Sequence, residues 1–404
     1  MVGIRPDGLV TVGVMRIAIV AESFLPQTNG VVTSVLHVLQ HLRRRGDDVL
    51  VIVPDAAGAD VPEEVHGARV VTVPSWSLPM YPDVRVATGG SGRLVRLLQD
   101  FAPDVVHLAS PFVLGWRATL AARELEIPVV AIYQTDVPAY AAGYGVPWAE
   151  RLLWRRVCDI HDRAALTLAP STSAVAALEE QGVERIRIWR RGVDAERFTP
   201  DRRDPVLRAE LAPEGQKLVG FVGRLAPEKQ VGDLAALAAV PGIRLVIIGD
   251  GPDRARLQAL LPDAHFAGML HGDDLGRHVA SLDVMVHPGE TETFCQVVQE
   301  GLAAGVPVVA VGKGGPIDLV DHSRTGWLYP PGDLDALAGF VRDLVGDEAK
   351  RKAFGTAARR AVLGRRWSSV CGELVGHYAA AIETGPPAEP FPLGLLRKRV
   401  KSRR

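Results

Sequence analysis

The chain has 404 residues and a formal net charge of −1. This length exceeds one ordinary domain core, and the near-zero charge argues against nucleic acid as a partner. Hydrophobic residues make up 47% and charged residues 23% of the chain, which is typical of a soluble globular protein. The cysteines Cys158, Cys295 and Cys371 are too far apart for a zinc motif or a disulfide framework, so a reducing, cytoplasmic location is expected.

The N-terminal apolar run LVTVGVMRIAIVA is interpreted as a buried first strand rather than a signal peptide. Arg16 interrupts the run, and no small-residue cleavage site follows it. Residues 1–14 are predicted to be a disordered extension that precedes the first strand, and a start of translation at Met1 or at Met15 stays open. No run reaches the roughly eighteen apolar residues that a membrane helix needs.

Strand-like runs alternate with helical patterns in two series. In the first series the strand-like runs are residues 16–21, 48–55, 104–109, 128–135 and 165–171, and a helix is expected over residues 31–45. In the second series they are residues 217–225, 243–251, 264–270, 282–288 and 306–312. Each series therefore predicts a parallel sheet covered by helices on both faces.

The two series predict an α/β protein with two doubly wound, Rossmann-like domains. A polar segment rich in Pro and Arg, residues 190–205, reads as the linker. The domains are expected over residues 15–192 and 193–375, and a helix end with a basic tail over residues 376–404. In this architecture ligands bind in the cleft at the carboxyl ends of the strands.

The most informative segment is residues 288–309, PGETETFCQVVQEGLAAGVPVV, which holds Glu292 and Glu300 eight residues apart. The spacing of its apolar residues predicts a helix that begins near Thr293 or Phe294. Amides at the start of a helix favour a diphosphate. The helical rise sets the two carboxylates roughly 10 to 12 Å apart, which suits the two ends of a nucleotide sugar.

Two cations, Arg224 and Lys229, follow a buried strand of the second series and are expected at the same cleft edge. They can bind a diphosphate and stabilise its departure. The alternative is that both pair with Glu228 or with solvent on a surface loop. Their place in the same half as Glu292 favours the diphosphate.

Glycines occur where two loops turn into helices. Gly30 follows the first strand, where it allows close approach of a phosphate or is an ordinary turn glycine after Asn29. Gly314 and Gly315 form a similar candidate loop, or only shape the turn before Pro316.

Candidate acceptor-side residues end strands of the first series. Asp136 is expected to face Glu292 across the cleft, where it can bind a sugar or orient an acceptor, and the alternative is an N-cap. Tyr133 and His107 are further candidates on this side, with core packing as the alternative for His107.

Motifs of several other enzyme classes are missing. No GxGxxG follows a strand, and GKGG at residues 312–315 lacks the other residues of a P-loop. A GxSxG elbow is also absent, which disfavours the common hydrolase interpretation. No metal and no other bound cofactor is expected.

Residues 385–404, GPPAEPFPLGLLRKRVKSRR, combine four prolines, an apolar patch and six basic residues. The prolines argue against a continued helix. Two interpretations stay open, a solvated disordered end and an anchor to an anionic membrane surface, where each basic residue contributes about 1 kcal/mol.

These residues resemble the retaining glycosyltransferases of family 4, which have the GT-B fold, over about residues 15–367. The family signature is a Glu, seven residues and a second Glu, with a Phe two residues after the first Glu and a Gly-x-Pro-Val that ends the helix. The sequence matches it at Glu292, Phe294, Glu300 and residues 305–308. The segments ESFLPQTNGVVTSV, YQTD and GETETFCQVVQEGLAAGVP are most similar to actinobacterial GDP-mannose-dependent α-mannosyltransferases that act on glycolipids.

The resemblance implies a role for each matched residue. Glu292 would contact the transferred sugar, with Thr293 and Phe294 beside it, and Glu300 the nucleotide ribose. Arg224 and Lys229 would bind the diphosphate. Family members read the base around residues 266–270, where Met269 is the candidate contact. The sequence departs from the family at Asp136, where many members have a His, and at Cys295 and Gly301, where Gly and Ala are common.

The expected function is transfer of mannose from GDP-mannose to a hydroxyl acceptor, such as a glycolipid or a phosphatidylinositol-type lipid, with retention at the anomeric carbon. Glu292, Asp136, Arg224 and Lys229 are the expected catalytic residues. A cytoplasmic enzyme, including one peripheral to the inner face of the plasma membrane, fits this activity. The alternatives are a UDP-sugar-dependent hexosyltransferase of the same fold and a non-catalytic subunit that binds a sugar nucleotide; an epimerase or phosphorylase is a further competitor.

Overall fold

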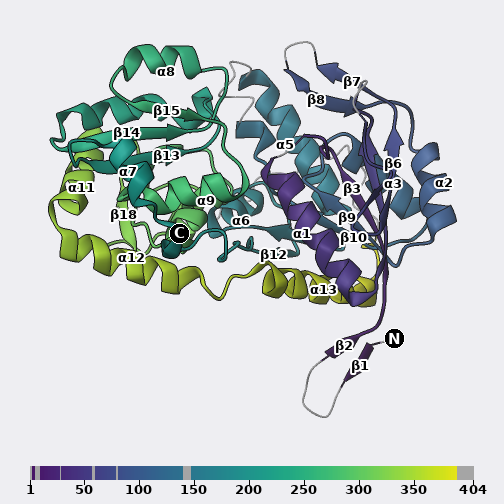
Figure 1. Cartoon of the computed structure of the whole chain (residues 1–404). Coiled ribbons are helices and arrows are strands. Elements are labelled where there is room, and N and C mark those ends of the chain that lie inside the picture. The colour runs from purple at the N-terminus through teal and green to yellow at the C-terminus, as the bar shows by residue number, and fades with distance from the viewer. Residues whose placement is uncertain are drawn as a thin grey trace, which may run out of the picture.

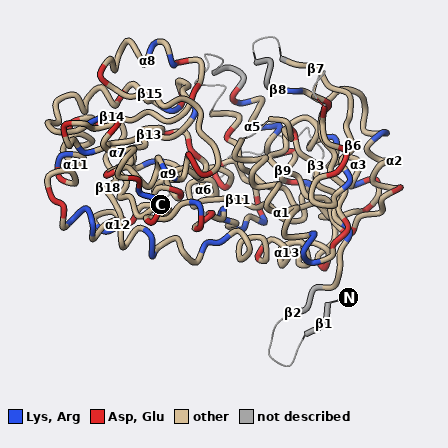
Figure 2. The backbone as a smooth tube through the Cα atoms, viewed as in Figure 1, with Lys and Arg blue, Asp and Glu red and all other residues tan. Residues whose placement is uncertain are grey.

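The computed structural model describes residues 2–4, 10–27, 29–56, 60–78, 81–139 and 147–388. It places two α/β domains side by side, each built on a mainly parallel sheet covered by helices (Figure 1). The predicted fold class of two doubly wound, Rossmann-like domains is confirmed. Basic and acidic residues are interspersed along both domains in Figure 2, in keeping with the net charge of −1.

The first domain contains an eight-stranded sheet in the order β12-β11-β10-β9-β3-β4-β6-β5, in which only β5 and β6 pair antiparallel. Ile17 and Ile19 of β3 pack into the core on one face, while Ala18 and Val20 pack into the core on the other. Burial on both faces explains why the strands read as continuous apolar runs. The strands are β3 (Arg16–Ala21), β4 (Asp48–Pro54), β5 (Glu64–Val65), β6 (Ala68–Val73), β9 (Val105–Ala109), β10 (Val129–Ile132), β11 (Leu166–Ala169) and β12 (Ile186–Ile188).

The helices of this domain begin at the carboxyl ends of the strands. Asn29 starts α1 because its side chain accepts hydrogen bonds from the N–H groups of Val31 and Val32, and Gly46, with φ of 84°, ends it. The elements are α1 (Gly30–Arg45), α2 (Gly92–Phe101), α3 (Leu114–Glu124), α5 (Pro147–Asp162), α6 (Thr172–Glu180) and a hairpin of β7 (Ser75–Leu78) and β8 (Tyr81–Ala87).

The second domain has a six-stranded parallel sheet in the order β15-β14-β13-β16-β17-β18. Its strands are β13 (Lys217–Val222), β14 (Ile243–Ile248), β15 (His265–Gly268), β16 (Val284–His287), β17 (Val308–Val311) and β18 (Gly326–Tyr329). The helices are α7 (Pro205–Leu211), α8 (Arg254–Leu260), α9 (Gly272–Ser281), α10 (Gln296–Ala303), α11 (Leu334–Gly346) and α12 (Glu348–Val362), with 3-10 turns η1 (Pro200–Arg202), η2 (Pro227–Lys229), η3 (Val231–Ala239) and η4 (Gly315–Asp318).

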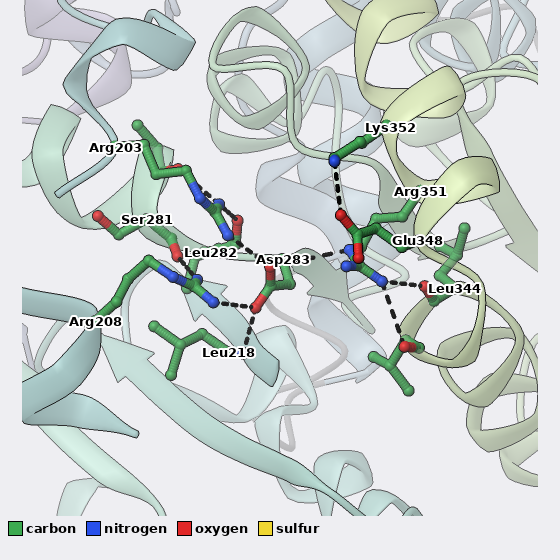
Figure 3. A network of polar contacts seen from close by, with 12 residues as sticks. Arg203, Arg208, Leu218, Ser281, Leu282, Asp283, Leu344, Glu348, Arg351 and Lys352 are labelled. Carbon is green, nitrogen blue, oxygen red and sulfur yellow. Dashed lines mark hydrogen bonds and ion pairs between the residues drawn. The ribbon is translucent and has the colours of Figure 1, made fainter. Parts of the chain in front are cut away.

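A buried carboxylate, Asp283, ties the linker to the second domain (Figure 3). It accepts hydrogen bonds from Arg203 at 2.6 Å, from Arg208 at 2.9 Å and from the N–H of Leu218 at 2.8 Å. Burial alone would raise the pKa of Asp283, but Arg203, the Leu218 N–H and Arg208 together lower it below its usual value. The network anchors the start of β16, whose other end carries the candidate site.

The last helix, α13 (Trp367–Thr384), lies on the first domain although it follows the second domain in the chain (Figure 1). Val370, Leu374 and Tyr378 are buried in the same core as β3 and α1. The structure differs here from a second domain that ends at residue 375. An amphipathic pattern indicates that a helix has a buried face, but not which sheet will cover it.

The chain therefore crosses between the domains twice, and the two crossings touch. Val193 and Arg366 form an isolated parallel bridge, and the N–H of Val193 donates to Arg365 O at 2.9 Å. A Cβ on Gly192 would lie 2.6 Å from Trp367 Cα, so the close approach requires glycine there. The first crossing lies inside the predicted linker of residues 190–205.

At the N-terminus, the predicted disordered extension of residues 1–14 contains two short antiparallel strands, β1 (Val2–Ile4) and β2 (Val10–Val12). Alternating valines favour an extended backbone. Residues 389–404, with the basic end of the tail, lie outside the described residues. Within the described ranges, no helix is both long and apolar enough to cross a membrane.

Candidate active site

The candidate residues of the second domain gather at the carboxyl ends of its central strands. Lys229 follows β13, Glu292 follows β16, and Gly314 and Gly315 follow β17. The loop of Glu292 also touches the first domain. Thr293 Oγ1 donates to Gln134 O at 2.8 Å, and Thr293 O accepts from Ser171 Oγ at 2.6 Å. The structure thus joins this loop to the end of β10, where Tyr133 and Asp136 were predicted to face it.

Glu292 is held by two donors on one oxygen atom. Lys229 Nζ lies 2.6 Å and His287 Nε2 lies 3.1 Å from Glu292 Oε1. Burial alone would raise the pKa of Glu292, but the Lys229 ammonium and His287 outweigh it and lower the pKa to about 2. Glu292 is therefore a fixed anion at neutral pH. The sequence-based interpretation found Lys229 but missed His287.

Arg224 lies on the loop after β13 with its side chain exposed. Within the residues that the structure covers, the Arg224 side chain has no hydrogen bond or ion pair, which fits the alternative in which it faces solvent. An exposed guanidinium is also available to bind an anion.

The helix that follows Glu292 starts later than the sequence predicts. α10 begins at Gln296 rather than near Thr293 or Phe294, because Cys295 has φ of 72° and breaks the regular turn. The Phe294 side chain is 1% exposed and packs in the core of the second domain. The predicted contact between the Phe294 ring and a bound donor is therefore wrong, because the ring is buried.

The loop after β17 packs tightly on the Glu292 loop. Gly315 N donates to Glu292 O at 2.7 Å, and a Cβ on Gly315 would lie 2.3 Å from Phe294 O. Gly314 has φ of 68°, a left-handed conformation that favours glycine. Both glycines thus shape the turn and bring its backbone against the candidate site.

Glu300 lies half-buried on α10. Burial raises the pKa of Glu300 to about 7, although a hydrogen bond from Gln296 and the charge of Arg197 oppose the shift. A carboxylate in this setting is a strong acceptor for hydroxyl groups, as the predicted ribose contact requires.

Met269 follows β15 and is 55% exposed, so its side chain is available to an aromatic base. Its place matches the segment where the resemblance expects the base.

Gly30 is the first residue of α1, and a Cβ there would lie 2.7 Å from Arg191 Nη1. Arg191 also donates to Gly30 O at 3.2 Å and to Gln134 Oε1 at 2.9 Å. The sequence indicated only an Arg-rich linker here and did not single out this buried arginine.

Asp136 caps the chain that follows it, since Oδ1 accepts from Ala139 N at 3.0 Å. This is the N-cap geometry of the alternative interpretation. Burial raises the pKa of Asp136, while the Ala139 N–H and Tyr133 lower it. Tyr133 is 3% exposed and stacks with Trp154 at 6.2 Å between ring centroids. Its ring thus belongs to a core cluster of the first domain.

His107 does not reach the cleft, contrary to its prediction as an acceptor-side residue. It is 1% exposed in the middle of β9, and its Nδ1 lies 2.5 Å from the hydroxyl of Tyr378 on α13. Burial lowers the pKa of His107 to about 3. The prediction for His107 is wrong because α13 packs over β9, a contact that the sequence does not indicate.

His287, Glu292 and Cys295 each have one possible metal-ligand atom within 4.8 Å of those of the other two. The arrangement suits a metal poorly. Burial and the charge of Glu292 raise the pKa of the Cys295 thiol well above its usual value. His287 Nδ1 is buried without a hydrogen-bond partner among the described residues, whereas a metal-bound histidine usually donates its second N–H.

Comparison with known proteins identifies the family. The family model for Glycosyltransferase Family 4 matches residues 28–197, and the model for Glycosyl transferases group 1 matches residues 203–361. A GDP-mannose-dependent alpha-mannosyltransferase of Mycobacterium tuberculosis is 52% identical over 375 residues, which cover 91% of this chain and 97% of the relative. A relative of the same name from Corynebacterium glutamicum is 43% identical over 372 residues, covering 91% and 89%.

A solved structure shares the architecture. Sucrose-phosphate synthase from Thermosynechococcus elongatus superposes with a TM-score of 0.76 at 20% identity, over 91% of this chain and 99% of that one, which shows a common fold. Together, the two family models and the relatives that match over most of the chain show that this chain belongs to glycosyltransferase family 4, and its two facing domains have the GT-B fold.

Proposed function

We propose that the protein is a GDP-mannose-dependent α-mannosyltransferase that transfers mannose to a hydroxyl acceptor between its two domains. The observation that carries the proposal is the Lys229–Glu292 pair at 2.6 Å on the cleft edge of the second domain. It combines a cation for the diphosphate with an anion for the sugar. The 52% identity to a relative of that name over nearly the whole chain supports mannose and GDP.

The site residues divide between the parts of the donor. Glu292 contacts the transferred sugar, Arg224 and Lys229 bind the diphosphate, and Glu300 accepts hydrogen bonds from the ribose. A lysine ammonium has three donors, so Lys229 can hold Glu292 and a phosphate oxygen together. Cations near the leaving diphosphate lower the barrier because they stabilise charge that develops in the transition state.

The proposed reaction retains the configuration at the anomeric carbon. The bond from that carbon to the β-phosphate oxygen breaks, the acceptor oxygen bonds on the same face, and the acceptor proton passes to the departing phosphate. The products are GDP and an α-mannoside. Glu292 and Asp136 flank an oxocarbenium-like sugar in this reaction, without a covalent intermediate. A mannosyl adduct on either residue, found by mass spectrometry, would contradict it.

No metal is needed in this proposal, because Arg224 and Lys229 supply the positive charge that a metal ion supplies in other sites. Full transfer in the presence of EDTA is the expected result. Loss of transfer that added Mg²⁺ or Mn²⁺ restores would refute it.

The acceptor is proposed to be a lipid-linked hydroxyl at an anionic membrane surface. The six basic residues within the last eight positions of the tail support this, since such clusters bind anionic lipids. Removal of residues 385–404 is expected to abolish sedimentation with vesicles that contain phosphatidylinositol, while transfer to a water-soluble acceptor is kept. Unchanged sedimentation would show that the tail does not bind the membrane surface.

The donor is tested by a thermal-shift screen of GDP- and UDP-sugars, followed by transfer assays. A donor at about 100 times its dissociation constant stabilises the protein by about 2.7 kcal/mol. GDP-mannose is expected to give the largest shift. A larger shift with a UDP-sugar would favour the alternative hexosyltransferase, and binding without transfer would favour a non-catalytic subunit.

Two variants in one loop test Glu292 itself. Glu292→Gln is expected to reduce transfer to a small residual rate and to spare much of the GDP binding. Glu290→Gln is the matched control, because Glu290 lies two residues away and pairs with Lys313 at 2.8 Å rather than with Lys229. Equal activity of the two variants would contradict the assignment.

A further inference from the structure

His287 ends β16, five residues before Glu292, and its ring is fixed on all sides. It is 1% exposed and stacks on Phe221 of β13, with ring centroids 5.9 Å apart and an interplanar angle of 15°. A Cβ on Gly289 would lie 3.3 Å from His287 Nε2, so the loop after β16 closes over the ring. Such a side chain has one accessible orientation.

The hydrogen bonds determine which ring nitrogen carries the proton. Glu292, with a pKa of about 2, is ionised and can only accept, so Nε2 at 3.1 Å must donate to it. Nδ1 is buried, and no described residue offers it a partner. A proton on Nδ1 would leave an unpaired N–H in the core, which is costly. The hydrogen bonds therefore place a proton of His287 on Nε2.

The two donors that Glu292 has among the described residues meet the same oxygen. His287 Nε2 and Lys229 Nζ are directed at Oε1, and no described residue donates to Oε2. One oxygen is thus used to hold the carboxylate in place, while the other can accept from a ligand hydroxyl. Two donors on one oxygen also fix the plane of the carboxylate better than one does.

We propose that His287 is a positioning residue that fixes the Glu292 carboxylate so that Oε2 faces the transferred sugar. The proposal rests on the proposed contact between Glu292 and the sugar. Lys229 cannot do this alone, because its flexible stem also serves the diphosphate. His287 is buried and stacked on Phe221, so its Nε2 offers Glu292 a donor in a fixed position.

Substitutions that move the donor by one bond length test the proposal. The amide nitrogen of His287→Gln can reach the place of Nε2, whereas that of His287→Asn reaches only the place of Nδ1. His287→Asn is expected to lower kcat about tenfold to hundredfold, the cost of a hydrogen bond to a charged group, with GDP affinity unchanged. His287→Gln is expected to recover most of kcat. Equal kcat in both variants would overturn the proposal.

A double variant separates positioning from general damage to the fold. In the Glu292→Gln background, His287→Asn is expected to cause no further loss of residual transfer or donor hydrolysis, because the group it positions is gone. Full additivity would refute the proposal. If Glu292→Gln alone keeps full transfer, the proposed role of Glu292 fails. If Glu292→Gln is impaired but His287→Asn is fully active, only the positioning role fails.

A measurement on the unmodified site covers the case in which His287→Asn fails to fold. Nitrogen-15 NMR of histidine-labelled protein is expected to show an Nε2–H imidazole whose resonances move in Glu292→Gln. An Nδ1–H tautomer, or resonances that do not respond to Glu292→Gln, would overturn the proposal.

Discussion

The Lys229–Glu292 pair gives a prediction whose size follows from the structure. Lys229→Met keeps the length of the side chain and removes its charge, which leaves a carboxylate with a 14% exposed side chain beside His287 alone. The pKa of Glu292 lies near 2, against an ordinary value of 4.5, and the difference corresponds to about 3 kcal/mol. Loss of one partner of a buried pair costs about this much. For a domain of this size, the melting temperature should fall by about 6 to 12 °C.

A double-mutant cycle measures this coupling at pH 7. Lys229→Met is expected to destabilise the wild-type protein far more than the Glu292→Gln variant, since the glutamine carries no charge to leave unpaired. Lys313→Met is the control, because Lys313 pairs with Glu290 while 58% exposed, and its loss should cost under about 1 kcal/mol. Equal costs of Lys229→Met in the two backgrounds would refute the reasoning.

The pH dependence of the same variant has a fixed sign. The folded-state pKa of Glu292 is depressed, so its stabilisation is complete above about pH 4.5 and is lost as the pH falls toward 2. The gap in melting temperature between wild type and Lys229→Met should therefore narrow over this range. A gap that widens in acid would contradict the assigned charge of Glu292.

Three further predictions concern single side chains. Burial raises the pKa of Glu300 to about 7, so wild-type stability should fall as the pH rises from about 4.5 through 7. Glu300→Gln should remove this fall and weaken GDP binding most above pH 7, as melting curves and calorimetry would show; the same pH dependence in the variant would count against the shift. Tyr378→Phe removes the hydrogen bond to His107 at a cost of about 1 to 3 kcal/mol in chemical unfolding, with kcat unchanged. A lower kcat in the folded Tyr378→Phe variant would indicate that His107 does contribute to the active site. Asp283→Asn leaves Arg203 and Arg208 without their carboxylate and should cost about 3 to 5 kcal/mol of unfolding free energy, which an unchanged melting temperature would rule out.

The sequence predicted the elements that depend on local pattern. Strands buried on both faces appear as apolar runs, and the helix predicted over residues 31–45 is α1 because Asn29 and Gly46 define its ends within a few residues. Glu292 and Lys229 could be placed at one cleft edge for the same reason. Each follows a strand, and parallel strands of one sheet end on the same side.

The residues that the sequence misplaced depend on contacts between distant segments. His107 ends a strand-like run, yet α13 returns from beyond residue 366 and buries it. Phe294 was expected beside the donor because of the family resemblance, but its ring packs in the core of the second domain. His287 was missed because a histidine at the end of a strand matches no motif. Only the structure shows that it lies 3.1 Å from Glu292. Periodicity describes one element at a time, whereas these positions are set by two.

The return of α13 makes the first domain discontinuous along the chain. During synthesis, residues 15–192 leave the ribosome long before residues 367–384, so Val38 and Leu39 lack the apolar surface of Val370 and Leu374 until the second domain has been made. The N-terminal half is therefore the last to complete its core, the reverse of the usual order in which domains mature. A chain cut after residue 366 would keep every residue of the candidate site and lose the helix that closes the domain opposite it.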